Sequence, residues 1–411
     1  MRCVTLAVFS ALVVVGSVTG CLQGVELIKP PEKATGDLSF HLRADPEDAA
    51  TAAALGWQGG IPGARLTLMT SDSAANALVA MTNSAGMATF ANVEIGHYQV
   101  EATRWLSPAE RVRLSANDDA LGFALMRANV DAIPEVSVPV TVPASRRRAL
   151  VISEFSFSGT NGYDYGGYLE LFNNADTTVY LDGMMLSRAL DVAADYPNFP
   201  CSMYTHITSD STSLWARQIE AFPGRGQDYP LAPGQTAVFA TDAIDHRPLW
   251  KHGLDLSNAT FESIGKADVD NPAVPNMINH GTVTQDHGLK FFDLANVVVL
   301  IRASDVSSFQ KSPVPGSSYE WYRIPAAEVL DVLWLRSSYV DPAYPECPRL
   351  VSPRFDRAGA DMRSSDENVK AERSISRRTI PELSSTRRIL QHTRTGRADF
   401  VLTPRTPGTV P

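Results

Sequence analysis

The chain has 411 residues, of which 44% are hydrophobic and 20% are charged, so it can bury more than one core and is not a disordered protein. Its formal net charge of -9 argues against nucleic acid as the main partner. The 27 glycines and 27 prolines favour many short strands and turns over long helices, which indicates an all-β fold.

The first twenty residues are typical of an export signal. Arg2 precedes an apolar run, residues 3–16, that is too short to span a bilayer. The small residues before Cys21 resemble the lipobox of bacterial lipoproteins. This resemblance implies lipidation of Cys21 and a membrane anchor on a chain that does not cross the membrane, and Leu22 then favours the outer membrane. An ordinary signal peptide followed by an incidental cysteine is the alternative. Residues 21–36 are predicted to form a proline-containing tether.

Residues 37–127 show a rhythm of strands and turns. Strands are predicted at 37–42, 64–68, 87–90 and 97–102, and residues 44–58 form a loop or a short helix. The order of these pieces, most clearly Asn-Val-Glu-Ile-Gly-His-Tyr at 92–98, resembles the carboxypeptidase regulatory-like domain, a small transthyretin-like β-sandwich. Such domains are spacers or docking modules without catalytic residues. Trp105 is predicted to be either a partly buried residue at the edge of the domain or an exposed residue that contacts a partner.

Residues 128–148 contain three prolines among valines and form an extended linker or an edge strand. A second domain is predicted from 149 to 411. It opens with strands at 149–157 and 168–173, and residues 173–176 form a turn. Strict alternation in the first strand places Ile152, Glu154 and Ser156 on one face.

Three segments of this domain, Ile-Ser-Glu-Phe at 152–155, Tyr-Leu-Glu-Leu-Phe-Asn-Asn at 168–174 and Val-Tyr-Leu-Asp-Gly at 179–183, resemble the lamin-tail domain. The turn at 229–235, the strand at 328–333 and Thr-Pro-Gly at 406–408 continue the resemblance, which implies a larger immunoglobulin-like β-sandwich with long loops. The segments at 222–230, 243–247, 254–262, 268–276, 322–325 and 373–378 resemble an uncharacterised family of bacterial lipoproteins, with domain of unknown function 4876. That family has no assigned activity.

Two groups of oxygen-bearing side chains are candidates for chemistry. Glu154 and Glu170 lie on strands that should be neighbours, where two carboxylates could hold Ca²⁺ or act as acid and base, although a structural role is favoured. Asp268, Asp270 and Asn271 are as oxygen-rich as a Ca²⁺ loop but lack the glycine and the distant glutamate of an EF-hand. An ordinary polar loop is the favoured interpretation, and no cofactor is predicted.

Aromatic residues in loop-like segments are the better candidates for ligand binding. Tyr163, Tyr165 and Trp215 lie in segments without regular periodicity, where they either contact a ligand or fill gaps between loops and sheets. Cys201 and Cys347 could pair in an oxidising compartment, but the sequence leaves their pairing open. The tail from 370 to 411 carries nine basic and three acidic residues, which indicates a solvated strand face or a patch that faces anions.

These observations predict a non-catalytic binding or accessory module of the cell envelope, lipid-anchored and most consistent with the outer membrane. An outer-membrane transporter or a surface glycan is the expected partner. An envelope hydrolase that uses Glu154 and Glu170, or a purely structural envelope protein, is the alternative.

Overall fold

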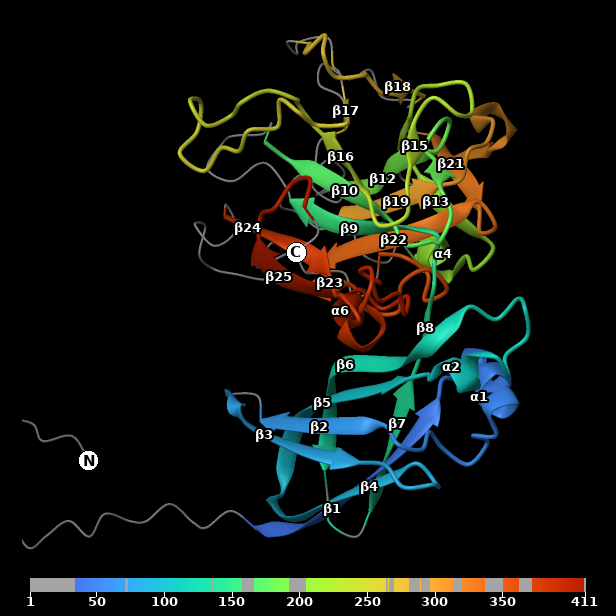
Figure 1. Ribbon diagram of the computed structural model, residues 1–411, viewed down its shortest axis with the longest axis vertical. Helices are drawn as coiled ribbons and strands as arrows, with labels where there is room; N and C mark the ends of the chain where they lie inside the picture. Colours follow the sequence, from blue (N-terminus) through green and yellow to red (C-terminus); the bar gives the residue numbers. More distant parts are fainter. Residues whose placement is uncertain are drawn as a thin grey trace, which may run out of the picture.

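The computed structural model describes residues 34–70, 73–132, 134, 136–156, 166–191, 205–263, 265, 270–280, 289, 296–313, 320–336, 350–361 and 372–409. These residues form two β-sandwich domains, one above the other, and the second domain carries an additional small sheet (Figure 1). The predicted all-β sandwich fold is therefore confirmed. Among the described residues, no helix has the length and the apolar character that a membrane crossing requires.

The first sandwich consists of a five-stranded and a three-stranded sheet, with strand orders β3-β2-β5-β6-β8 and β4-β1-β7. Its strands are β1 (Thr35–Ala44), β2 (Arg65–Thr70), β3 (Ser73–Met81), β4 (Met87–Glu94), β5 (Gly96–Trp105), β6 (Ala120–Ala132), β7 (Ser137–Val142) and β8 (Ala144–Arg146). Its helices are η1 (Pro46–Asp48), α1 (Ala49–Leu55) and α2 (Pro108–Arg111). The core between the sheets includes Phe40, Leu66 and Phe123, all 0% exposed.

Residues 128–148, which the sequence predicts to be either a linker or an edge strand, contribute strands to both sheets of this sandwich. β7 pairs in parallel with β1, so that Ser39 lies opposite Ser137, and β8 pairs with β6. The first sandwich thus extends to Arg146, beyond the expected end at residue 127. A parallel pairing of segments a hundred residues apart leaves no mark on local periodicity, which explains the difference.

The second domain has three layers rather than the two of a simple sandwich. Its first sheet contains β9 (Leu150–Ser156), β10 (Tyr168–Asn173), β16 (Thr236–Ala240), β17 (Phe261–Glu262), β24 (Arg373–Arg377) and β25 (Phe400–Pro404), in the order β17-β16-β10-β9-β24-β25. Its second contains β12 (Met185–Asp191), β14 (Gln218–Ala221), β18 (Ile278–Asn279), β19 (Asn296–Ile301), β22 (Val329–Arg336) and β23 (Ala360–Asp361), in the order β18-β14-β12-β19-β22-β23.

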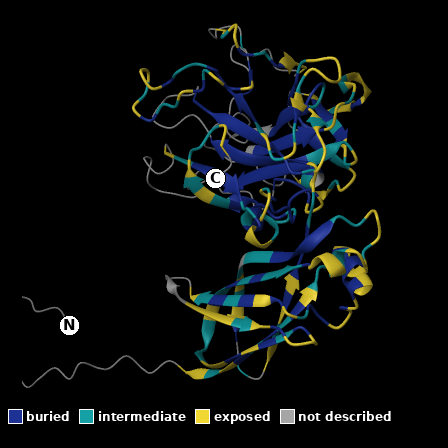
Figure 2. Ribbon diagram, in the orientation of Figure 1, coloured by how far each residue is buried: buried dark blue, intermediate teal, exposed yellow. Residues whose placement is uncertain are grey.

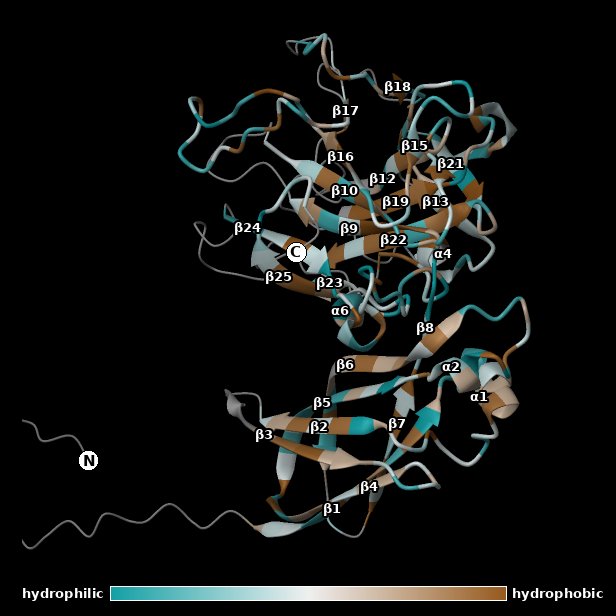
Figure 3. Cartoon of the chain, in the orientation of Figure 1, coloured by the Kyte–Doolittle hydropathy of each residue, from teal (hydrophilic) through white to brown (hydrophobic). Residues whose placement is uncertain are grey.

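The third layer is a sheet of β13 (Ser213–Ala216), β20 (Gln310–Pro313) and β21 (Glu320–Pro325). The smaller elements are β11 (Val179–Tyr180), β15 (Pro230–Leu231), α4 (Thr205–Ser209), η3 (Val306–Ser308), η4 (Pro381–Leu383) and α6 (Gly396–Asp399). Leu169 and Leu300 belong to the core between the two large sheets, while Val299 and Trp321 belong to the core under the third layer. The central strands are accordingly buried and apolar (Figures 2 and 3).

A β-bulge in β9 decides which residues face the core. Leu171 pairs with Ile152 and Glu170 with Glu154, so β9 uses one more residue than β10 between these pairs. Ile152 and Phe155 consequently both face the core, and Glu154 lies on the other face beside Glu170. The prediction that Ile152 and Glu154 share a face is wrong, because strict alternation holds only where no residue is inserted.

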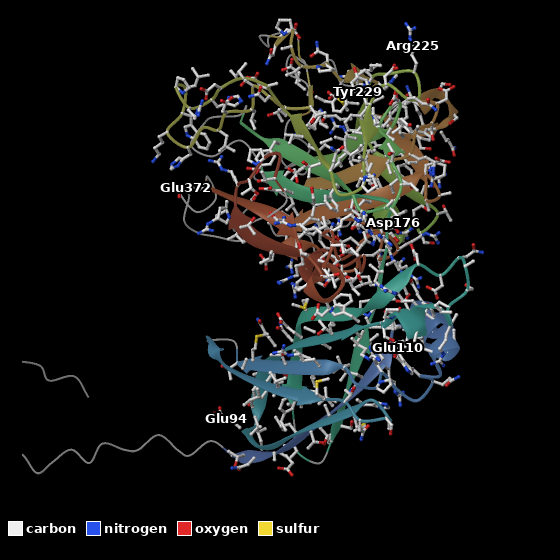
Figure 4. The ribbon with its side chains drawn as sticks, in the orientation of Figure 1. Glu94, Glu110, Asp176, Arg225, Tyr229 and Glu372 are labelled. Atoms are coloured by element: carbon white, nitrogen blue, oxygen red, sulfur yellow. The ribbon has the colours of Figure 1, made fainter. Side chains whose placement is uncertain are left out.

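Ion pairs join the two domains along their junction. The Glu47 carboxylate accepts hydrogen bonds from Arg357 at 2.9 Å and from Arg394 at 2.7 Å, both of which belong to the second domain. Asp176, on the side of the second domain that faces the first, accepts from Arg147 at 2.6 Å (Figure 4). The Arg146 amide, at the end of β8, donates to the His392 carbonyl at 2.8 Å.

Candidate functional site

A groove of about 440 Å³ lies where the two domains meet. β5 and β6 of the first sandwich form one wall, and β24, β25 and the segment around η4 form the other. A cavity of this size at a domain interface suits a small ligand. Its lining residues are Thr103, Trp105, Met126, Ser376, Arg377, Arg378, Thr379, Pro381, Glu382, Gln391, Val401 and Thr403.

The first wall of the groove carries an aromatic side chain. Trp105 ends β5 and pairs with Gly122 of β6, where a Cβ atom would clash with the indole ring. The missing side chain at Gly122 therefore lets the ring lie against β6. Trp105 remains half-buried, because it packs against a small cluster that contains Leu121 and Ile380, one from each domain. The ring belongs both to the groove and to the domain junction.

The second wall carries most of the polar groups of the groove, together with the apolar side chains of Pro381 and Val401. The Ser376 and Thr403 hydroxyl groups lie 2.6 Å apart on adjacent strands, and Glu382 is exposed at the rim. The Trp105 ring and its apolar neighbours lie opposite hydroxyl, amide and charged groups, an arrangement that suits a ligand with both an apolar and a polar face.

A buried network of charges lies behind this wall. Arg377 donates to Asp331 at 2.6 Å and to the Gln391 carbonyl at 3.1 Å, and Asp331 also accepts from His392 at 3.2 Å if that ring nitrogen carries a proton. Burial raises the pKa of Asp331, but the Arg377 guanidinium and the His392 ring hold it below its usual value. The network thus ties β22 to β24 behind the floor of the groove.

Glu154 and Glu170 lie on neighbouring strands as predicted, and both are 0% exposed. Glu154 accepts hydrogen bonds from the hydroxyl groups of Tyr168 and Ser374, both at 2.5 Å, and Glu170 accepts from Ser153 at 2.9 Å. Neither carboxylate is among the residues that line the groove. Both are held by hydroxyl groups of β9, β10 and β24, as expected of carboxylates that serve the fold.

The two carboxylates instead hold the end of the chain. The Thr406 amide donates to Glu154 at 2.9 Å and its hydroxyl at 2.8 Å, and the Gly408 amide donates to Glu170 at 2.8 Å. Burial, together with the charge of Glu154, raises the pKa of Glu170 to about 7. The Thr-Pro-Gly segment of the lamin-tail resemblance is therefore the structural partner of these glutamates.

Trp215 is a packing residue. The prediction that it lies in a loop is wrong, because it belongs to β13, and only 8% of it is exposed. Its indole donates to Asp210 at 3.0 Å, and Arg323 stacks over its ring at 5.2 Å. Short strands of the third layer have no clear alternation, so the sequence did not reveal β13.

The predicted metal loop lies only partly within the described residues. Asn271 uses its side-chain amide to donate to the carbonyls of Ala243 and Ser257, and Asp270 accepts from Asn276 at 2.7 Å. Asp268 lies outside the described residues. Within the described part of the chain, no group of three or more metal-binding side chains gathers at one place.

Several other predicted site residues also lie outside the described part of the chain. They are Cys21, Tyr163, Tyr165, Cys201 and Cys347. The groove itself was not predicted from the sequence. Its walls come from segments about 270 residues apart, and the only signal for it was the possibility that Trp105 is a contact residue.

Comparisons with known proteins place the fold. No family model and no curated protein matches the chain. Among solved structures, it is similar to the crystal structure of a DUF4876 family protein from Bacteroides thetaiotaomicron VPI-5482, with 16% sequence identity and a TM-score of 0.50. The similarity covers 91% of this chain and 95% of that chain. The two proteins therefore share a fold that spans both domains.

Proposed function

We propose that this protein is a lipid-anchored, non-catalytic binding module of the bacterial cell envelope, and that the groove between its domains takes a glycan. The observation that carries the proposal is the pairing of Trp105 with a polar wall in a groove of about 440 Å³. Sugar rings present an apolar face and a rim of hydroxyl groups. An indole can pack on the apolar face of the sugar, while hydroxyl, amide and carboxylate side chains can form hydrogen bonds with its hydroxyl groups.

Membership of the DUF4876 family belongs to the same proposal. The sequence segments between 222 and 276 resemble that family, and the shared fold supports the assignment. The lipobox-like residues before Cys21 support anchoring at the outer membrane, where a surface glycan or a transporter would be within reach. The proline-containing tether would hold the first sandwich away from the lipid surface.

The test is retention of the full chain in a gel that contains cell-surface polysaccharide. Trp105→Ala should weaken retention several-fold and by up to about tenfold, because an aromatic contact is worth roughly 0.5–1.5 kcal/mol. Glu382→Gln changes an exposed rim group and threatens the fold less, and it should weaken retention by a smaller factor. Trp250→Ala, which removes a half-buried indole outside the groove, is the matched control.

The outcomes separate the partners. Retention that Trp105→Ala and Glu382→Gln reduce, and that Trp250→Ala leaves unchanged, supports glycan binding in the groove. If no surface polysaccharide is retained but a transporter is captured from solubilised envelopes, the glycan assignment fails and the accessory role remains. If neither binds, the proposed function is wrong.

A further inference from the structure

A second cavity, of about 230 Å³, opens beside the start of β22. Asp331 and His392 of the buried network line this cavity, whereas Arg377 and Gln391 of the same network line the groove. From its chemistry we propose that this cavity binds a small organic anion, through a carboxylate or phosphate group. The inference goes beyond the proposed function, since none of the residues that line this cavity lines the groove.

The cavity gathers positive charge. Three guanidinium groups line it, from Arg148, Arg354 and Arg394, together with the ring of His392. Asp331 is the one carboxylate among its lining residues. Arg394 is paired with Glu47, so the uncompensated charge is that of Arg148 and Arg354, and an anion that enters the cavity would neutralise it.

Asp331 does not neutralise these arginines. Its two oxygens already accept from the Ile152 amide at 2.8 Å, the Val332 amide at 2.9 Å and Arg377 at 2.6 Å. The carboxylate is 1% exposed, and its charge is compensated by Arg377, which does not line the cavity. The uncompensated charge of the cavity is therefore that of Arg148 and Arg354.

Two of the three arginines are available to a ligand. The side chains of Arg148 and Arg354 make no hydrogen bond or ion pair with the described residues, and both residues are exposed. Arg394 is held in place, since it donates to Glu47 at 2.7 Å and to the Arg354 carbonyl at 3.1 Å. The cavity therefore combines one fixed guanidinium with two that can close on an oxyanion, a geometry that favours bidentate bonds.

The backbone at Arg394 provides a separate observation. Its φ is +57°, a left-handed conformation that residues with a side chain rarely adopt. Arg394 and Asn92 are the only described residues other than glycine with a positive φ. The side chain of Arg394 bonds Glu47, and the residue lines the cavity. Strain of this kind is often retained where a side chain has a binding role.

The other wall of the cavity indicates an organic ligand rather than a free inorganic ion. It is formed by Ala326, Val329 and Phe355, which are apolar. A volume of about 230 Å³ is several times the roughly 30 Å³ that one water molecule occupies in the liquid. There is thus room for a short carbon skeleton on the apolar wall while its charged group meets Arg148 and Arg354.

The experiment uses the full chain and isothermal titration at low salt, with two pairs of probes. Glucuronate is compared with glucose, and glycerol phosphate with glycerol, so that each anion has a neutral partner of similar size. The structure leads us to expect binding of at least one anion and of neither neutral partner. Arg148→Gln and Arg354→Gln should each weaken it about tenfold, as expected for the loss of one charge-assisted hydrogen bond.

Arg225→Gln is the matched control, because this exposed arginine lies at the far end of the second domain (Figure 4). Preference for glucuronate identifies a carboxylate ligand, and preference for glycerol phosphate a phosphate ligand. The proposal is overturned if neither anion binds, if the neutral partners bind equally well, or if Arg225→Gln weakens binding as much as Arg148→Gln and Arg354→Gln do. Loss of groove binding leaves this result unaffected, because Trp105 lies outside the cavity.

Discussion

The Arg377 guanidinium lies 2.6 Å from the Asp331 carboxylate in the interior of the second domain, and each side chain is 1% exposed. Arg377 belongs to β24 of the first large sheet and Asp331 to β22 of the second, so this ion pair joins the two sheets. Asp399 is a second acidic partner of Arg377, at 3.5 Å. The pair therefore connects the core of the domain to the floor of the groove.

Replacing Arg377 by methionine should destabilise the protein by about 3–5 kcal/mol, because Asp331 would remain buried without its main counter-charge. Urea denaturation with an unchanged m-value measures this loss. Arg247→Gln is the control, since this arginine is 60% exposed and its ion pairs with Asp245 and Asp255 are screened by solvent. Equal midpoints for the two variants would contradict the importance of the buried pair.

Stability should fall between pH 5 and pH 8. Burial raises the pKa of Glu170, Glu220 and Asp356 to about 7, from 4.5 for the glutamates and 3.8 for the aspartate. The folded state therefore holds protons that the unfolded chain has already released. The raised pKa values stabilise the folded protein fully when the pH is below the pKa values of the unfolded chain. This stabilisation is lost as the pH rises through about 7.

Glu170→Gln should remove part of this dependence. Between pH 5 and pH 8, the unfolding free energy of the variant should rise by about 2 kcal/mol relative to that of the unmodified protein. Thermal unfolding at both pH values measures the shift. Glu382→Gln, at an exposed position, should give the same difference at both pH values, and a pH-independent effect of Glu170→Gln would exclude the proposed linkage.

Deleting residues 405–411 should destabilise the second domain by about 2–4 kcal/mol. The deletion leaves Glu154 and Glu170 buried without the bonds from Thr406 and Gly408. Deleting only 409–411 keeps those donors and should have little effect. The two truncations, compared by thermal unfolding, should differ clearly, and similar melting temperatures would mean that the glutamates do not depend on the tail.

Cys21→Ser should release the protein from membranes, because a lipid chain on this sulfur is the proposed anchor. Fractionation of cells that express the full chain measures the change. Cys3→Ser is the control, since this cysteine lies within the predicted signal and should leave membrane attachment intact. Membrane association that persists in Cys21→Ser would contradict the lipobox interpretation.

Local pattern was enough to predict much of the β architecture. The strands at 37–42, 87–90 and 168–173 are predicted by alternation and turn residues, which act over a few positions, and each overlaps an observed strand. The strand at 328–333, which the lamin-tail resemblance implies, overlaps β22. The neighbouring placement of Glu154 and Glu170 followed from the short connection between their strands. The basic tail was also visible, although the sequence could not show that Arg377 is buried against Asp331.

Local sequence pattern is therefore sufficient for the all-β class, the order of many strands and the adjacency of two glutamates, since these depend on neighbours along the chain. The bulge that turns Glu154 away from the core, the parallel pairing of β7 with β1, the groove at Trp105 and the arginine-lined cavity are visible only in the folded protein. Each of these depends on which distant segments meet, and that choice is made by packing over the whole domain rather than by local preference.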